Sequence, residues 1–356
     1  MLKYFISIIC VILVLSSCDK KSTNPKPEPE EHLFYVGAKT GGLVKIFSVE
    51  ENMFIDSLIC DSIPEDMETT LNVIGKDSVL AISCVKGTYF IDLHTKQVSG
   101  VINFAELSIS PDSKYYMGQN ISENNRFELR ILEDNSFICE IAHSYEHFSN
   151  DSRYVSSVRY FGNDSINIVV YDILTGNTSS SQGFSQGSRV WFWLNYPIGK
   201  YQKTIFGASA DPFRYFGGIL DFYSDSVRIL KNFSILDYYE ANMPIAIVDL
   251  DDKYAYLSTM IGTAFGGIPD GKIYVYDVES EDSIGTIDIG LNVVPSAYSI
   301  SYDGKYLIAK TLEESGSDLK SEFYLIDTEE LTVIGVYDYG GYLSKIASRN
   351  NIKIGE

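Results

Sequence analysis

A short phrase recurs along this chain at intervals of tens of residues, and it restricts the available folds more than any other feature. The phrase consists of a turn, an apolar strand, a second apolar strand that ends in Asp, and a third strand. Its clearest copies are Thr88-Tyr-Phe-Ile-Asp92, Ile168-Val-Val-Tyr-Asp172, Ile273-Tyr-Val-Tyr-Asp277 and Phe323-Tyr-Leu-Ile-Asp327. Self-similarity at such a period is the signature of a repeat architecture.

A second phrase precedes the strand pairs and has the chemistry of a tight turn. Its full copies are Ser110-Pro-Asp-Ser-Lys-Tyr115, Ser149-Asn-Asp-Ser-Arg-Tyr154 and Ser301-Tyr-Asp-Gly-Lys-Tyr306. Asp, Ser and Gly favour turns, and the Lys-Tyr or Arg-Tyr pair opens the next strand. With the shorter copies included, strands are expected to start at Leu33, Ser78, Lys114, Arg153, Lys200, Lys253 and Lys305.

Steps of about 40 to 50 residues between these starts match the four-stranded blades of a β-propeller. The middle strands are apolar at nearly every position, as expected for a sheet that is covered on both faces. We therefore predict an all-β fold for residues 33–356, a single seven-bladed β-propeller with four-stranded antiparallel blades. The first blade lacks its innermost strand before Leu33. We expect the segment Leu343–Asn351 to supply that strand, close the ring and remove an exposed strand edge.

The first residues have the parts of a secretory signal. Lys3 precedes an apolar run from Tyr4 to Leu15, and small residues follow up to Cys18. A membrane span would need about 20 apolar residues, which this run does not reach. We therefore interpret residues 1–17 as a signal peptide that is removed from the mature protein.

The segment Leu15-Ser-Ser-Cys18 resembles the lipobox of bacterial lipoproteins. The resemblance implies that Cys18 is acylated and becomes the first residue of the mature chain. Two or more acyl chains are sufficient for stable membrane anchoring. Residues 18–32, with Pro at 25, 27 and 29, are expected to form an extended tether. The expected location is the bacterial cell envelope on the extracytoplasmic side, at the outer membrane or the cell surface.

The body of the chain resembles the YVTN-type repeats of seven-bladed propellers and, more distantly, the WD40 group. The matching segments are Phe34-Tyr-Val-Gly37, Val44-Lys-Ile-Phe-Ser-Val49, Ser110-Pro-Asp-Ser113 and Asp172-Ile-Leu-Thr-Gly-Asn177. No blade carries the full Tyr-Val-Thr-Asn string, and the Gly-His and Trp-Asp pairs of WD40 repeats are absent. The resemblance implies a binding scaffold, since enzymes are a minority in that family.

Charge and composition exclude some functions. The formal net charge of −20 and the lack of a basic run argue against nucleic-acid binding. After export and acylation, Cys60, Cys84 and Cys139 remain in apolar strands, where they are expected to act as small hydrophobic residues. The sequence contains no recognisable catalytic motif and no zinc-like spacing of His and Cys, so neither catalytic residues nor metal ligands are assigned.

Two recurring residue types are expected to be structural. Asp92, Asp172, Asp277 and Asp327 are each followed by hairpin-like sequence, where an Asp side chain satisfies nearby backbone N–H groups. Most of the 26 tyrosines lie in the turn phrase or inside strands, where aromatic side chains pack well. The apolar run Val190–Leu194 is expected to be an inner strand.

Loop length indicates where recognition could occur. The connection between the second and third strands is expected to be long in blades five to seven, at 208–217, 261–271 and 312–320. Loops on a rigid scaffold commonly carry function. The candidate binding residues are Asp211, Arg214, Tyr215, Phe216, Phe265 and Asp270. An acidic segment from Asp61 to Glu68 on the same face would favour a cationic partner or Ca²⁺.

The sequence therefore predicts a membrane-anchored, extracytoplasmic binding module for a protein, small-molecule or glycan ligand. Two alternatives stay open. One is a hydrolase or lactonase-like enzyme with a carboxylate-lined central channel and a Ca²⁺ requirement. The other is a structural envelope subunit without a small ligand. No cofactor is otherwise expected.

Overall fold

The chain divides into two compact units, Met1–His32 and Leu33–Glu356. The computed structural model describes residues 31–38, 41–64, 70–75, 78–123, 126–141, 147–149, 151–161, 165–180, 191–194, 203–210, 214–221, 226–229, 241–248, 253–261, 271–280, 282–290, 295–311, 321–341 and 343–348. These residues contain no helix with the length and apolar character that a bilayer crossing requires.

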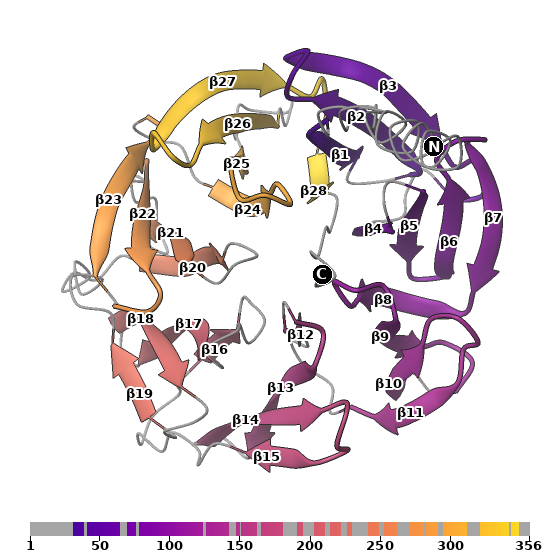
Figure 1. The fold of residues 1–356 in the computed structure, drawn as a ribbon, viewed down its shortest axis with the longest axis horizontal. Helices are drawn as coiled ribbons and strands as arrows, with labels where there is room; N and C mark the ends of the chain where they lie inside the picture. Colours follow the sequence, from indigo (N-terminus) through magenta and orange to yellow (C-terminus); the bar gives the residue numbers. More distant parts are fainter. Residues whose placement is uncertain are drawn as a thin grey trace, which may run out of the picture. The chain divides into compact units, whose positions relative to one another are not determined.

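The described strands form seven four-stranded antiparallel sheets (Figure 1). The first three sheets, in strand order, are β28 (Leu343–Ser348), β1 (Leu33–Ala38), β2 (Leu43–Ser48) and β3 (Met53–Ile59); β4 (Thr70–Ile74), β5 (Val79–Cys84), β6 (Gly87–Asp92) and β7 (Gln97–Ile102); and β8 (Phe104–Ile109), β9 (Tyr115–Asn120), β10 (Arg126–Ile131) and β11 (Phe137–Glu140).

Each of the other four sheets consists of four strands that are consecutive in the chain. They are β12 (His147–Phe148), β13 (Tyr154–Phe161), β14 (Ser165–Asp172) and β15 (Thr178–Ser180); β16 (Trp191–Leu194), β17 (Lys203–Ala210), β18 (Arg214–Asp221) and β19 (Ser226–Ile229); β20 (Ala241–Val248), β21 (Tyr254–Ile261), β22 (Lys272–Asp277) and β23 (Ser283–Asp288); and β24 (Pro295–Ile300), β25 (Tyr306–Thr311), β26 (Glu322–Asp327) and β27 (Thr332–Asp338). Second strands begin within three residues of the expected positions.

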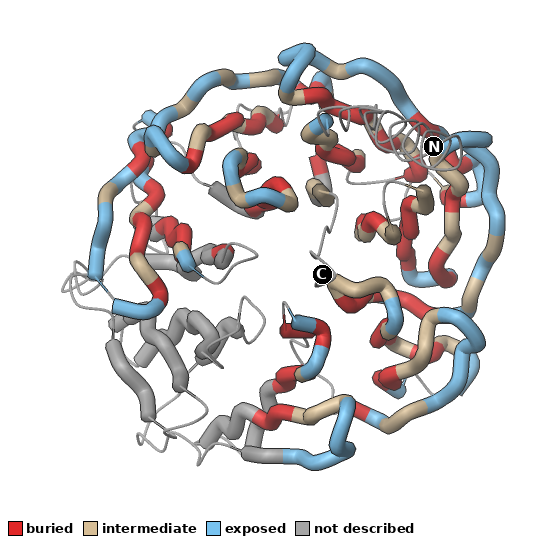
Figure 2. Tube along the Cα trace, in the orientation of Figure 1, coloured by how far each residue is buried: buried red, intermediate tan, exposed pale blue. Residues whose placement is uncertain are grey.

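Many contacts between neighbouring sheets involve their first strands. Strand β4 lies against β8 and β28, and β20 lies against β17 and β24. The apolar core is divided among these contacts. One cluster joins Val44 and Tyr35 to Leu80 and Ile82, and another joins residues of β22 to residues of β25. In Figure 2 the buried positions gather on the first three strands of the coloured sheets, whereas the fourth strands are largely exposed.

The C-terminal strand β28 pairs antiparallel with β1, the first described strand of the chain. The register places Tyr35 opposite Ala347 and Val36 opposite Ile346. Leu343 is fully buried in the cluster that also contains Phe34. Consecutive residues of β1 are buried because both faces of its sheet are covered.

The Ser-x-Asp phrases form the tight turns that the sequence predicts. Ser110 Oγ donates a hydrogen bond to Asp112 Oδ1 at 2.8 Å and accepts one from the N–H of Tyr115 at 2.9 Å. Asp112 Oδ1 also accepts the N–H of Lys114 at 3.1 Å. The phrases that begin at Ser149 and Ser301 repeat these hydrogen bonds, so the three turns share the same pattern of side-chain contacts.

The repeated Asp residues cap the turns between third and fourth strands, as expected. Asp92 Oδ1 accepts the N–H groups of His94 and Thr95 at 2.9 and 2.8 Å. The equivalent carboxylates of Asp172, Asp277 and Asp327 accept the same pair of backbone donors. The recurrence of Asp is therefore explained by turn formation.

Candidate functional site

Most of the predicted recognition residues fall where the structure gives no side-chain description. Cys18, Asp211, Phe265 and Asp270 lie outside the described residues, as do most of the predicted long loops. The acidic segment is described only in part, with Asp61 included and residues 65–69 outside.

The predicted loop at 208–217 is wrong in its extent. Strand β17 continues to Ala210 and β18 starts at Arg214, with Tyr215 opposite Ser209 and Phe216 opposite Ala208. The pairing continues because Tyr and Phe favour strands. Arg214, Tyr215 and Phe216 therefore belong to a strand, and for these three positions the structure describes the backbone alone.

A pocket of about 470 Å³ lies between the sheet of β20–β23 and the sheet of β24–β27. Its lining consists of Lys253, Tyr254, Val275, Ile284, Asp303, Gly304, Lys305, Thr328, Glu329 and Leu331. Three of the contributing segments are the start of β21, the turn before β25 and the turn between β26 and β27. In antiparallel sheets these turns lie at the opposite end from the predicted long loops, which connect second and third strands.

Gly304 is the first of three positions where this pocket differs from other turns of the repeat. The residue before the Lys or Arg is Ser113 or Ser152 in two equivalent turns, with φ of 58° and 59°, and Gly304 has φ of 75°. Gly199 and Asp252 occupy this position in two further copies of the turn phrase. Ser113 Oγ accepts a hydrogen bond from the N–H of Gly75, and Ser152 Oγ accepts one from the N–H of Asp112, at 3.2 and 2.9 Å. Each Ser thereby fills the space next to the preceding sheet. Gly304 has no side chain to place there.

Thr328 is the second departure. The residue after the turn Asp is apolar in other sheets, namely Leu93, Ile173 and Val278. Thr328 is 8% exposed, and its hydroxyl donates a 2.5 Å hydrogen bond to the carbonyl oxygen of Gly304. The hydroxyl therefore ties together two of the turns that line the pocket.

Leu331 is the third departure, and its backbone has an unfavourable conformation. The equivalent positions Lys96, Asn135 and Gly176 have φ of 57°, 62° and 70°, and Leu331 has φ of 52°. A bulky apolar residue rarely adopts this left-handed conformation, and such outliers often mark functional sites. A Cβ atom on Gly285 of β23 would lie 2.7 Å from Cδ1 of Leu331, so the glycine makes room for Leu331.

The pocket has an apolar interior and a charged rim. Val275 is fully buried, and Tyr254 and Leu331 are half-buried beside the core between the two sheets. On the rim, Lys253 Nζ lies 4.5 Å from the centre of the Tyr254 ring. Lys305 Nζ lies 3.5 Å from Asp303 Oδ2, and Glu329 is exposed. Both signs of charge therefore surround an apolar surface.

Lys253 also acts on the turn at the end of β22. The pKa of Asp277 lies below its ordinary value, mainly because the N–H of Ser280 donates to the carboxylate, with a smaller contribution from the charge of Lys253. In the sheet of β12–β15, the equivalent residues Arg153 and Asp172 form an ion pair at 2.9 Å. A cation at this position is thus part of the repeat, and its role at Asp277 is structural.

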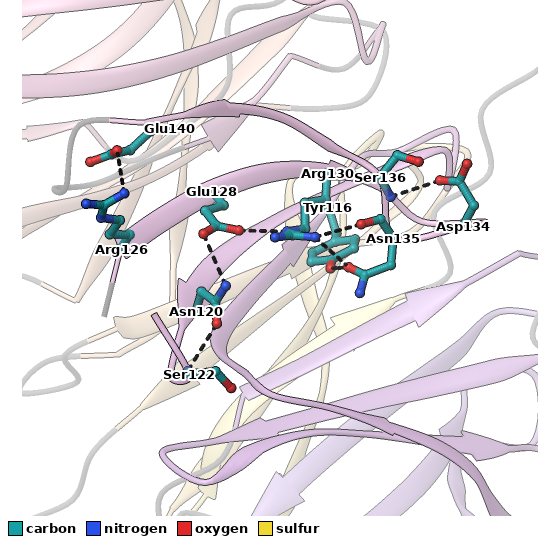
Figure 3. A network of polar contacts seen from close by, with 10 residues as sticks. All are labelled: Tyr116, Asn120, Ser122, Arg126, Glu128, Arg130, Asp134, Asn135, Ser136 and Glu140. Carbon is teal, nitrogen blue, oxygen red and sulfur yellow. Dashed lines mark hydrogen bonds and ion pairs between the residues drawn. The ribbon is translucent and has the colours of Figure 1, made fainter. Parts of the chain in front are cut away.

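A separate polar network lies on the sheet of β8–β11 (Figure 3). The Glu128 side chain is 3% exposed, and its carboxylate accepts hydrogen bonds from Asn120 Nδ2 at 3.1 Å and Arg130 Nε at 2.7 Å. Arg130 also donates to the carbonyl oxygen of Asn135 at 2.7 Å. The Tyr116 hydroxyl donates to Asn135 Oδ1, and burial raises the pKa of Tyr116 to about 12.

This network holds the sheet together and does not present a ligand site. Glu128 is enclosed, and its carboxylate is satisfied by protein donors, which is the condition for burying a charge. This network was not predicted from the sequence, although charged residues at 126, 128 and 130 alternate with Phe127 and Leu129 along β10. Such alternation in a strand predicts that the charged side chains share one face of the sheet.

The described residues contain no group of three or more side chains suited to hold a metal ion. Cys60 and Cys84 are buried and Cys139 is half-buried, all three as free thiols. Burial raises the pKa of Cys60 and of Cys139, which disfavours the reactive thiolate. Among the residues of β4 and β8, both inner strands, Glu106 is the only carboxylate. It is exposed and has φ of 51°.

Comparisons with known proteins support the fold. No family model and no curated protein matches the sequence. Dihydro-heme d1 dehydrogenase NirN in complex with DHE has 13% identity and a TM-score of 0.55, with 89% of this chain and 75% of that chain covered. Hydrazine synthase of Kuenenia stuttgartiensis has 14% identity and a TM-score of 0.55, with 85% and 91% covered. These likenesses establish a β-propeller fold.

Proposed function

We propose that this chain is a lipid-anchored, extracytoplasmic binding protein built on a seven-bladed β-propeller that β28 closes. The pairing of β28 with β1 and the seven four-stranded sheets support the closed ring. The export-signal features of residues 1–17 and the Leu-Ser-Ser-Cys segment that ends at Cys18 support export and lipid anchoring. The resemblance to YVTN-type repeats remains a prediction.

Contacts between the first and last sheets also support ring closure. The rings of Phe47 and Phe323 meet edge to face with centroids 5.2 Å apart, and Tyr337 lies 4.7 Å from Phe47. Lys45 Nζ donates a 2.7 Å hydrogen bond to the carbonyl oxygen of Tyr339. Aromatic pairs and charge-assisted hydrogen bonds stabilise a contact more than other polar pairs do. These contacts therefore support the packing of the sheet that contains β1–β3 against the sheet of β24–β27.

The observation that carries the binding function is the convergence of three departures from the repeat on one pocket. Thr328 replaces an apolar residue and Leu331 replaces Lys, Asn or Gly of the equivalent turns, whereas Gly304 replaces the Ser of two of those turns. All three line the same 470 Å³ pocket. Ligand sites are concave and largely apolar, with a few placed polar groups. The unfavourable left-handed backbone of Leu331 at this pocket is of the kind that often marks functional sites.

Binding is tested by a thermal-shift screen of metabolites, amino acids, peptides and saccharides against the full chain in detergent. We expect at least one class to raise the melting temperature of the wild type and not of Gly304→Ser, because the new side chain occupies the pocket. Ser113 and Ser152 show that Ser is tolerated at this φ. A screen in which no compound distinguishes the two proteins would contradict a binding role for the pocket.

Lipid anchoring is tested independently with Cys18→Ser. The wild type should take up labelled fatty acid and partition into the detergent phase of a Triton X-114 separation. The variant should do neither, because it lacks the acylated thiol. Acylation of the variant, or an unacylated wild type, would contradict the anchor.

One observation favours a second candidate function, a hydrolase that acts from the central channel. Glu106 combines an exposed carboxylate with a left-handed backbone on the inner strand β8. Strain of this kind occurs at active sites. Loss of a measured hydrolase activity in Glu106→Gln, with unchanged folding, would favour this alternative over the binding module.

A further inference from the structure

We propose that Ser57, Ser62 and Ser283 are acceptor sites for O-linked saccharides, which an extracytoplasmic transferase attaches to this chain. The inference goes beyond the proposed binding function. It uses only the proposed export of the chain, and the pocket has no part in it. Three observations carry it: a recurring tripeptide that the fold does not require, three exposed hydroxyl groups without hydrogen bonds, and apolar edge strands beside two of them.

The tripeptide consists of Asp, Ser and an aliphatic residue, and it recurs without following the repeat. The six copies begin at Asp56, Asp61, Asp77, Asp164, Asp225 and Asp282. They lie inside β3, after β3, before β5, and at the starts of β14, β19 and β23. These places are not equivalent in the sheets, whereas the turn phrases recur at equivalent places. The repeat therefore does not explain the tripeptide.

The Ser-x-Asp turns show what an Asp-Ser pair with a structural role is like. Asp112-Ser113 and Asp151-Ser152 occupy equivalent turns, and a Lys or Arg follows each pair. Both serine hydroxyls accept a hydrogen bond from the backbone of the preceding sheet. These two pairs stabilise the fold, and neither has an aliphatic residue in third place.

Three copies of the tripeptide present a hydroxyl group to solvent. Ser57, Ser62 and Ser283 are all exposed, as are the Asp residues that precede them. Within the described part of the chain, none of these three hydroxyl groups makes a hydrogen bond. Ser78 differs, because it is half-buried and its hydroxyl donates to the carbonyl oxygen of Ile74 at 3.3 Å. Three positions thus have space for a bulky substituent.

A saccharide is the substituent that suits these positions. A phosphate group would place more negative charge beside an Asp, on a chain whose formal net charge is already −20. A neutral saccharide adds no charge, and glycosylation is a bulky, solubilising modification of protein surfaces.

The transfer is a substitution at the sugar. The Ser Oγ atom attacks the anomeric carbon of a sugar that is carried on a lipid diphosphate. A bond forms between Oγ and the anomeric carbon while the bond from that carbon to the diphosphate oxygen breaks. The lipid diphosphate leaves, and the hydroxyl proton passes to a base of the transferase.

Two of the sites lie beside apolar side chains on exposed edge strands. Ser57 lies in β3, the fourth strand of its sheet, between Ile55 and Ile59, which are 40% and 67% exposed. Ser283 begins β23, another fourth strand, and Ile284 after it is 48% exposed. Exposed apolar edge strands are prone to pair with a second chain. A saccharide would screen both edges, which gives the modification a physical role.

The third residue of the tripeptide indicates when the transferase acts. Leu58 and Ile63 are 2% and 4% exposed in the folded chain, so an enzyme can contact them only before their segments pack. The transfer therefore belongs to export, while the chain is still extended. Exposure in the folded state then determines which copies can carry a saccharide without disrupting the fold.

The experiment is peptide mass spectrometry of the full chain, expressed in its native host and purified in detergent, with fragmentation that retains O-linked groups. Ser57, Ser62 and Ser283 should each carry the mass increment of a saccharide, which β-elimination removes. Ser122 is the internal control. It is exposed and its hydroxyl has no hydrogen bond in the described structure, but it lies between Ile121 and Glu123. Its peptide should carry no increment.

Substitutions test whether the tripeptide is what the transferase recognises. Asp56→Asn should remove the increment from Ser57 while Ser62 and Ser283 stay modified. Glu51→Gln is the matched control, because it changes an exposed carboxylate near the same strand and should leave all three sites modified. A triple Ser→Ala variant at the three sites should lack the increments and aggregate more readily in light scattering, with a melting temperature near that of the wild type.

The outcomes separate this inference from the proposed lipid anchor. Saccharide on the three serines, lost from Ser57 in Asp56→Asn, supports the proposal. Unmodified serines in a wild type that takes up labelled fatty acid overturn the proposal and leave the anchor standing. A phosphate increment, an unchanged Ser57 increment in Asp56→Asn, or an equal increment on Ser122 would also overturn it. A wild type with neither fatty acid nor saccharide would contradict both.

Discussion

The backbone N–H of Asp112 donates a 2.9 Å hydrogen bond to Oγ of Ser152, and this bond joins two successive sheets at their turns. The N–H of Gly75 donates to Ser113 Oγ in the same way at 3.2 Å. Both serines have a positive φ, which is unfavourable for a residue with a side chain. The hydrogen bond to the neighbouring sheet offsets that local strain.

Replacing Ser152 separates these two effects. Ser152→Ala loses the hydrogen bond and keeps the strain, so the free energy of unfolding should fall by about 1 kcal/mol or more. Ser152→Gly loses the same bond but relieves about 1 kcal/mol of strain, so it should be close to the wild type. Urea denaturation measures both. An Ala variant as stable as the Gly variant would contradict the role of the hydrogen bond.

Removal of β28 should destabilise the propeller strongly. A chain without residues 343–356 exposes the edge of β1 and loses Leu343, which is fully buried. Burial of one such side chain contributes about 2 kcal/mol, and the lost strand pairing adds to it. We expect a markedly lower melting temperature by differential scanning calorimetry.

A chain that ends at Ser348 is the control for that truncation. It retains all of β28, so its melting temperature should match that of the full chain. An unchanged melting curve in the longer truncation would contradict closure of the ring by β28.

Breaking the buried ion pair of β10 should be costly. Arg130→Met leaves the Glu128 carboxylate buried with Asn120 Nδ2 as a hydrogen-bond donor and without its cation, so the free energy of unfolding should fall by about 3 kcal/mol. Glu140→Gln is the matched control, because its ion pair with Arg126 is exposed at 3.8 Å and should contribute less than about 1 kcal/mol. Equal effects of the two variants in urea denaturation would contradict the structural role of the network.

Stability should depend on pH through Asp172. The hydrogen bond from Arg153 lowers the pKa of the Asp172 carboxyl below its ordinary value, and the N–H groups of Thr175 and Leu174 contribute in the same direction. A lowered pKa in the folded state means that this stabilisation is complete above the ordinary pKa of about 4 and is lost as the pH falls through the folded pKa. The destabilisation caused by Arg153→Met should therefore be larger at pH 7 than at pH 3. Equal destabilisation at both pH values would contradict this ion-pair contribution.

Much of the fold could be predicted from the sequence because each repeat is specified locally. Asp92 and Ser110 make their hydrogen bonds within five residues, so the turn chemistry is visible without tertiary information. The missing partner of β1 could be inferred because the repeat leaves one strand unpaired, and β28 occupies that place.

The candidate site could not be predicted in the same way. Gly304, Thr328 and Leu331 are unremarkable as single residues, and they become informative only when aligned with their equivalents in other sheets. Their proximity depends on packing between sheets, where Gly285 accommodates Leu331. Arg214, Tyr215 and Phe216 belong to β18, and Asp211 and Pro212 just before them have the composition of a turn.

The most direct test of the account is a crystal structure of the full chain. The account predicts a closed ring of seven four-stranded sheets, with β28 paired to β1 and Tyr35 opposite Ala347. A ring with another number of sheets, or an edge of β1 without β28, would contradict it.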